Sequence, residues 1–119
     1  MVTTMMAPTT TFSESLESGR AGIRVVDFLG DEPSALGPEQ APPVAEAVLD
    51  ALKHGEVELT FAGVQGVTTA FTNNLLLLIF SDYSFGDLRG RLHFRFSSRL
   101  QRDVLDRSMT ALKELKSSP

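Results

Sequence analysis

The sequence predicts a single α/β domain in which three helices cover one face of a mixed sheet of four to five strands, in the order β-β-α-β-α-β-α. Residues 56–63 and 90–97 alternate apolar and polar side chains, which is typical of strands with one buried face. Residues 42–55, 70–80 and 97–116 place apolar side chains at helical spacing. Strands with one polar face, together with three amphipathic or apolar helices, indicate a two-layer sandwich.

The composition is that of a globular protein of one domain. The chain has 119 residues, of which 42% are hydrophobic and 22% charged, and a chain of this size buries roughly two thirds of its unfolded surface. It has no Cys, which excludes disulfides, thiolate catalysis and Cys-based zinc sites. The apolar run Leu75–Phe80 is far shorter than the ~20 residues that span a membrane, and residues 1–12 lack the pattern of a secretory signal. We therefore expect a cytoplasmic protein without a membrane partner.

The first elements follow from local patterns. We expect residues 1–10 to be flexible and residues 11–119 to form the domain. Residues 11–18 predict an edge strand, and residues 22–30, with high β-propensity, predict a second strand. Residues 30–38 predict a loop because they are rich in Gly, Pro, Asp and Ser.

The first helix is predicted over residues 42–55. Proline is tolerated in its first turn. Val44, Val48 and Leu52 form an apolar stripe, and Gly55 suits the helix end.

The two alternating strands carry opposite charges on their polar faces. The strand over 56–63 has Glu56 and Glu58 there, and the strand over 90–97 has a basic set: Arg91, His93 and Arg95. Opposite charges on neighbouring strands can pair, each pair contributing about 0.2–1 kcal/mol. These basic residues therefore have two candidate roles, pairing with the glutamates within the sheet and binding of an anion.

Within residues 57–80, the third strand is followed by the second helix, and the stretch "GVQGVTTAFTNN" joins them. Thr68 or Thr69 is placed to cap a helix that begins near Ala70 and continues to about Phe80. The helix is apolar on most sides, so it is central in the fold or partly covered by a partner. In the last helix, Ser98 followed by Gln101 matches a capping box.

The segment "VELTFAGVQGVTTAFTNNLLLLI" resembles the strand–loop–helix core of STAS domains, the fold of the anti-sigma factor antagonists. It is most similar to a STAS-like family of largely uncharacterised bacterial proteins, whose strand ends in a pattern like "DFxGV" and is followed by "VTxSF" and an Asn or acidic residue. The matching residues here are 60–64, 67–71 and Asn73.

The resemblance implies a role in partner switching. Antagonists of this kind bind a histidine-kinase-like ATPase, and phosphorylation of a hydroxyl at the start of the following helix breaks that complex. The corresponding residue is Thr69, and Thr68 stands where the antagonists have Asp. A phosphate there adds roughly −1.5 to −2 charge to an interface while remaining compatible with the helix N-terminus. Helix capping alone is the alternative role of Thr69.

We therefore expect a non-enzymatic protein-interaction module in bacterial signalling or regulation, whose partner is a histidine-kinase-like ATPase or another regulator. Its candidate contact residues are Thr68, Thr69, Phe71, Asn73 and Asn74. Exposed strand edges and the apolar helix would also suit a homodimer. The alternative function is an anion or nucleic-acid binder that uses the basic residues of 89–102, namely Arg89, Arg91, His93, Arg95, Arg99 and Arg102.

Charge and motif content limit the other functions. Residues 1–87 carry a net charge of −9 and residues 88–119 a net charge of +5, which indicates either a basic patch for an acidic partner or two halves that neutralise each other. The overall charge of −4 disfavours nucleic acid. No cofactor is expected, because "GVQG" lacks the Lys and the glycines of a P-loop. Asp82 and Asp87 flank a loop that could hold carboxylates, but no nucleophile–base or metal-ligand set accompanies them.

Overall fold

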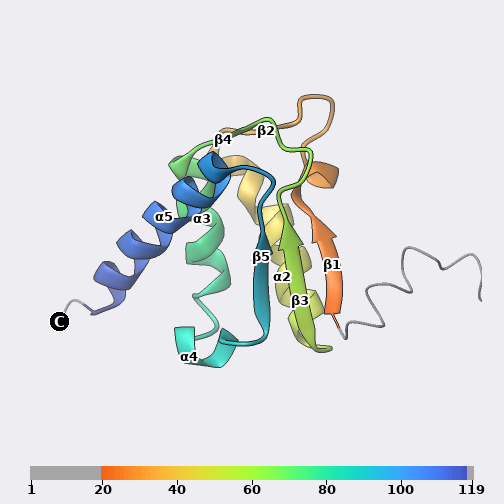
Figure 1. Ribbon diagram of the computed structural model, residues 1–119. Coiled ribbons are helices and arrows are strands. Elements are labelled where there is room, and N and C mark those ends of the chain that lie inside the picture. Colours follow the sequence, from red (N-terminus) through yellow and green to blue (C-terminus); the bar gives the residue numbers. More distant parts are fainter. Residues whose placement is uncertain (1–19, 118–119) are drawn as a thin grey trace, which may run out of the picture.

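The computed structural model describes residues 20–117, and within them a sheet lies beside a layer of helices (Figure 1). The predictions for residues 1–10 and 11–18 fall outside the described residues. In chain order, the elements are β1 (Arg20–Arg24), the 3₁₀ helix η2 (Val25–Phe28), β2 (Ser34–Ala35), the 3₁₀ helix η3 (Pro38–Gln40), α2 (Ala41–Leu52), β3 (Glu56–Thr60), β4 (Gly66–Val67), α3 (Thr69–Ile79), α4 (Phe85–Leu88), β5 (Leu92–Arg95) and α5 (Arg99–Ser117).

Every strand pair among the described residues is parallel. In the main sheet β3 lies between β1 and β5, with Arg20 opposite Glu56 and Val57 opposite Leu92. β2 and β4 form a separate parallel pair of two residues each. The α/β class is confirmed. The described sheet has three parallel strands, whereas the sequence predicted a mixed sheet of four to five.

The alternation predicted for the third strand is confirmed by burial. Val57 and Leu59 of β3 are fully buried, and Glu56 and Glu58 on the opposite face are half-buried. Parallel sheets are usually covered on both faces, and their strands then consist of continuous apolar runs. Here the described helices occupy one face of the sheet, and among residues 20–117 no helix covers the face that carries the polar residues of β3.

β1 ends earlier than predicted. The strand predicted over 22–30 stops at Arg24, and the chain enters η2. Val25 and Leu29 are both buried, and their separation of four residues suits a helical turn better than an alternating strand. Burial of both side chains on one side therefore overrides the β-propensity of this segment.

The three predicted long helices are confirmed and pack in series, α2 on α3 and α3 on α5. α3 is the central helix, and its buried residues are Phe71, Thr72, Leu75, Leu76 and Ile79. None of the described helices is long and apolar enough to cross a membrane. The central position of α3 explains why its sequence is apolar on most sides.

One polar contact crosses the interface between α3 and α5. The hydroxyls of Thr72 and Ser108 form a hydrogen bond, and both side chains are buried. We expect Thr72→Val to lower the free energy of unfolding by about 1–3 kcal/mol, because it leaves the Ser108 hydroxyl buried without this partner. Urea denaturation followed by circular dichroism measures the change.

The double variant Thr72→Val/Ser108→Ala is the control, since it removes both hydroxyls. Its loss of stability should be smaller than the sum of the two single losses, because no buried hydroxyl remains unpaired. Strictly additive losses would contradict an energetic role for this hydrogen bond.

Candidate functional site

The candidate site comprises the loop after β3 and the first turns of α3, residues 63–74. β3 ends at Thr60, and Gly63 then turns the chain with φ +85°, a conformation that favours glycine. The Gln101 side chain fixes this turn because its Nε2 donates to the carbonyls of Phe61 (3.1 Å) and Val64 (3.0 Å). The site is therefore attached to the start of α5 as well as to the sheet.

Thr68 is the N-cap of α3. Its Oγ1 accepts from the N–H of Phe71 (3.3 Å) and donates to the carbonyl of Leu36 (2.6 Å). Its own N–H donates to the carbonyl of Ala35 at 3.1 Å. The prediction that Thr68 or Thr69 caps the helix thus resolves to Thr68, whose backbone and side chain are both engaged.

Thr69 is the first residue of α3 and is exposed. Its hydroxyl makes no hydrogen bond with any described residue, so it has no capping role. Asn73 is also exposed, one turn further along the same side of the helix. Among the predicted contact residues, Thr69 and Asn73 are the two whose side chains are exposed and form no hydrogen bond with any residue that the structure describes.

The other predicted contact residues have structural roles. Phe71 is fully buried, so it supports α3 from the core and presents no surface to a partner. Asn74 donates from Nδ2 to the carbonyl of Pro38 at 2.8 Å, which attaches α3 to η3. The sequence motif placed these residues on one helix but did not separate its buried side from its exposed side.

An apolar groove continues from Asn73 along α3. It has a volume of about 140 Å³ and is lined by Asn73, Leu77, Ser108, Ala111, Leu112 and Leu115. Leu77 is 45% exposed and Leu115 62% exposed. Thr69, Asn73 and Leu77 are spaced by four residues and so lie in one line that ends at this groove. We call this line and groove the α3 surface.

Two glutamines hold the site, and the sequence analysis missed that role for both. Gln40 Oε1 accepts from the N–H groups of Leu36 and Gly37, each at 2.8 Å, which orders the segment that receives the Thr68 hydroxyl. Gln101 was predicted to return to Ser98 in a capping box. Its Oε1 instead accepts from the N–H of Ser97 at 2.8 Å, while Ser98 Oγ accepts from the N–H of Gln101. The spacing signalled a cap, but nothing local signalled the contacts with Phe61 and Val64.

Three of the six basic residues of the alternative site have partners within the chain. His93 Nε2 lies 3.1 Å from Glu56 Oε1, and Arg95 Nε lies 2.8 Å from Glu58 Oε2. The pairing of these residues with the glutamates of β3 is thus confirmed. Arg91 donates to the carbonyl of Leu52 at the end of α2. These contacts disfavour an anion site on the polar face of the sheet.

The carboxylates near residue 85 have a local role. Ser84 Oγ accepts from the N–H of Asp87 and the Ser84 N–H donates to Asp87 Oδ2, both at 3.1 Å, which caps the short helix α4. Hydrogen bonding by the Ser84 backbone, and secondly by its side chain, holds the pKa of Asp87 below its ordinary value. Within residues 20–117 there is no cluster of three or more His, Asp or Glu side chains that could hold a metal ion.

Comparisons of the chain with family models, with curated proteins and with solved structures gave no match. The similarity to STAS domains therefore rests on the sequence motif around residues 60–73.

Proposed function

We propose that this protein is a non-enzymatic interaction module that docks a partner protein through the α3 surface. The observation that carries the proposal is the uncharged line of exposed side chains from Thr69 through Asn73 to Leu77, which leads into an apolar groove. Exposed apolar residues gathered beside polar ones are typical of protein-binding surfaces. The similarity to STAS domains supports the same helix as the binding element.

The proposed partner is a histidine-kinase-like ATPase or another cytoplasmic regulator in bacterial signalling. Thr69 is the proposed phospho-acceptor, and three features support it. Its hydroxyl is exposed, it has no capping duty because Thr68 performs that role, and it lies in the first turn of an α-helix of eleven residues. A phosphate there would be compatible with the helix dipole and would introduce charge into an uncharged surface.

Thr69→Glu is expected to weaken partner binding at least about tenfold, since it places a charge in an interface that buries uncharged groups. The free energy of unfolding should change little, because Thr69 is exposed and Glu suits a first helical turn. The measurement is affinity capture from the host cytosol with mass spectrometry, followed by titration of the purified partner.

Thr110→Glu is the matched control, because Thr110 is also exposed on a helix but lies outside the α3 surface. A partner retained by the wild type and Thr110→Glu but lost by Thr69→Glu would support the proposal. Equal retention by all three proteins would remove the α3 surface as the docking site. Incubation of the purified pair with ATP, read by intact mass, tests phosphorylation, and Thr69→Val should abolish any added phosphate.

A further inference from the structure

Within residues 20–117, no strand pairs with the outer backbone edge of β5. The strand order β1-β3-β5 places β5 at the side of the sheet. The N–H groups of Val57 and Phe61 donate to the carbonyls of Arg91 and Arg95, at 2.8 and 2.9 Å. Because backbone groups of successive residues point to opposite sides of a strand, residues 91, 93 and 95 face β3. The N–H and C=O groups of Leu92 and Phe94 therefore face outward.

The order of the elements indicates where a further strand would be added to the sheet. α2 connects β1 to β3 and α3 connects β3 to β5, so each new strand lies beside the previous one. α5 leaves β5 in the same manner and packs on α3. A fourth strand beside β5 would complete the pattern, but the described residues contain none. The side of β5 away from β3 faces the region of α4 and α5 (Figure 1).

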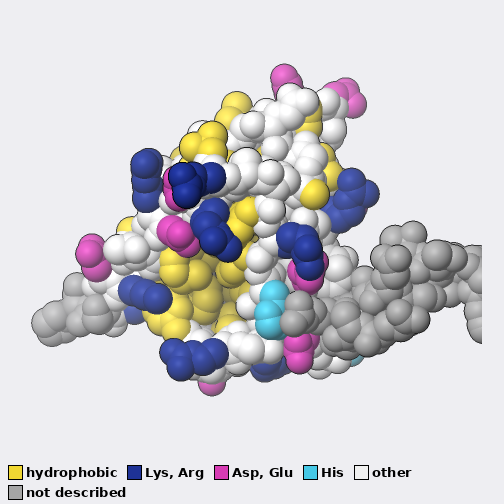
Figure 2. Space-filling view, viewed as in Figure 1, with side chains coloured by type: hydrophobic (Ala, Val, Ile, Leu, Met, Phe, Trp, Pro, Cys, Tyr) yellow, Lys and Arg dark blue, Asp and Glu magenta, His cyan; other side chains and the backbone are white. Residues whose placement is uncertain are grey.

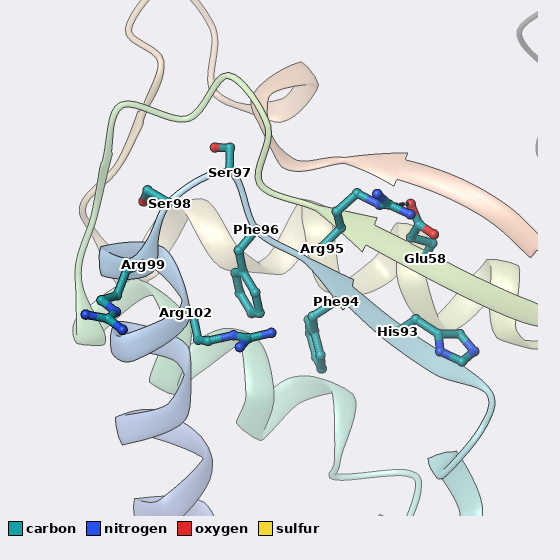
Figure 3. A pocket seen from close by; sticks show the side chains of 9 residues that line it. All are labelled: Glu58, His93, Phe94, Arg95, Phe96, Ser97, Ser98, Arg99 and Arg102. Carbon is teal, nitrogen blue, oxygen red and sulfur yellow. Dashed lines mark hydrogen bonds and ion pairs between the residues drawn. The ribbon is translucent and has the colours of Figure 1, made fainter.

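Two hollows, of about 670 Å³ and 270 Å³, follow β5 along this edge and share Phe94 in their lining. We call them together the β5 groove. The rings of Phe94 and Phe96 are half-buried and stack with centroids 6.4 Å apart. The Arg102 guanidinium extends from α5 over the Phe96 ring, at 5.8 Å (Figure 3). Since the side chain of Phe94 lies in the groove and its backbone faces the outer edge, one extended segment could contact both.

The β5 groove is basic at both ends. Arg95, Arg99 and Arg102 line the end near the start of α5, and Arg89 and Lys113 line the end near α4. Figure 2 shows apolar side chains on this face with Lys and Arg side chains around them. Glu58 is the acidic residue of the lining, and Arg95 binds it. Arg99 and Arg102 form no ion pair with any described residue. The charge and shape of the groove thus suit a ligand with an apolar centre and acidic ends.

We propose that an extended segment of a partner protein, apolar at its centre and acidic at both ends, docks along β5 as an additional strand. Its backbone pairs with the outward groups of Leu92 and Phe94, its apolar side chains cover Phe94 and Phe96, and its carboxylates approach Arg102 and Lys113. Addition of a strand to a sheet edge is a general mode of peptide recognition. This interaction uses a surface separate from the α3 surface and does not depend on it.

The probe is a fluorescein-labelled peptide in which Val and Thr alternate at the centre and Glu occupies both ends, measured by fluorescence polarisation. A second peptide carries Lys in place of Glu, and a third carries N-methyl groups on the backbone nitrogens of one side. We expect the acidic peptide to bind, the Lys peptide to bind at least about tenfold more weakly, and the N-methylated peptide to lose binding because it cannot pair with the edge.

Amide hydrogen exchange of the full chain locates the contact. The acidic peptide should slow exchange at Phe94, whose N–H faces outward, and change exchange at His93 little, because that N–H already faces β3. Arg102→Glu should weaken binding at least about tenfold. Arg107→Glu, an exposed charge reversal on the same helix outside the β5 groove, should leave binding unchanged.

Three results would overturn the proposal. One is equal binding of the acidic and N-methylated peptides, and another is absence of acidic-peptide binding to the wild type. The third is concentration-dependent dimerisation of the chain alone with protection of the Phe94 amide, which would assign the groove to a second copy.

Discussion

Replacement of Phe71 by alanine is expected to lower the free energy of unfolding by about 3–5 kcal/mol, the range for deletion of a buried aromatic side chain. Phe71 is among the largest fully buried side chains, and it belongs to α3, which packs between α2 and α5. A cavity at this position removes contacts from the centre of the helix layer, so the whole fold should be affected. Urea denaturation by circular dichroism and by tyrosine fluorescence should give coincident transitions at a lower midpoint.

Asn73→Ala is the matched control, because Asn73 lies two residues away on the exposed side of α3. Its free energy of unfolding should stay within about 0.5 kcal/mol of the wild-type value, while its affinity for a partner should fall. A small effect of Phe71→Ala, comparable with that of Asn73→Ala, would show that Phe71 is not the core residue described above. The comparison separates loss of binding caused by unfolding from loss caused by a missing contact.

Gln101→Met should lower the free energy of unfolding by about 2–4 kcal/mol, since it keeps the volume of a buried side chain but removes hydrogen bonds to three backbone groups, each costing roughly 1–3 kcal/mol when left unpaired. These groups are the carbonyls of Phe61 and Val64 and the N–H of Ser97. The Phe61 carbonyl keeps one partner, because it also accepts from the N–H of Val64 at 3.0 Å. The loss should therefore fall short of three full penalties.

Gln101→Glu tests the same contacts through the pH dependence of the free energy of unfolding. It keeps the acceptor for Ser97 but directs a carboxylate at two carbonyl oxygens, so the carboxyl group should prefer its protonated form. Its pKa in the folded protein should rise above its unfolded value, and the variant should become less stable as pH rises through that range. A stability difference from wild type that is independent of pH would contradict this arrangement. Gln65→Met, at an exposed position, serves as the neutral control.

The sequence predicted best those elements whose burial follows a regular period. The alternation of Val57, Leu59 and their polar neighbours gave β3, and the helical spacing over 97–116 gave α5. The pair formed by β2 and β4 was missed, because two residues in each strand are too few to establish a period. The predicted strand over 22–30 extends beyond the end of β1, because β-propensity alone does not show that Val25 and Leu29 are buried on the same side.

The contacts of the candidate residues could not be predicted in detail from the sequence. The choice of Thr68 as the cap depends on its hydrogen bonds to Ala35 and Leu36, which are more than thirty residues earlier in the chain and leave no local signal. The motif likewise placed Phe71 and Asn73 together, although one is buried and the other exposed. The alternation over residues 90–97 separates Phe94 and Phe96 from Arg91 and Arg95. It could not predict the approach of Arg102 from α5 to the Phe96 ring.

The parallel sheet also has a consequence for how the chain folds. Arg20 pairs with Glu56, 36 positions later, and Val57 pairs with Leu92, 35 positions later. No tight hairpin between adjacent strands exists in residues 20–117 to nucleate the sheet, so each pairing requires a helix to form first and deliver the next strand. Folding should therefore be slower than in helical proteins of the same length. It should proceed through successive strand–helix units from the N-terminal side. The chain emerges in the same order during synthesis.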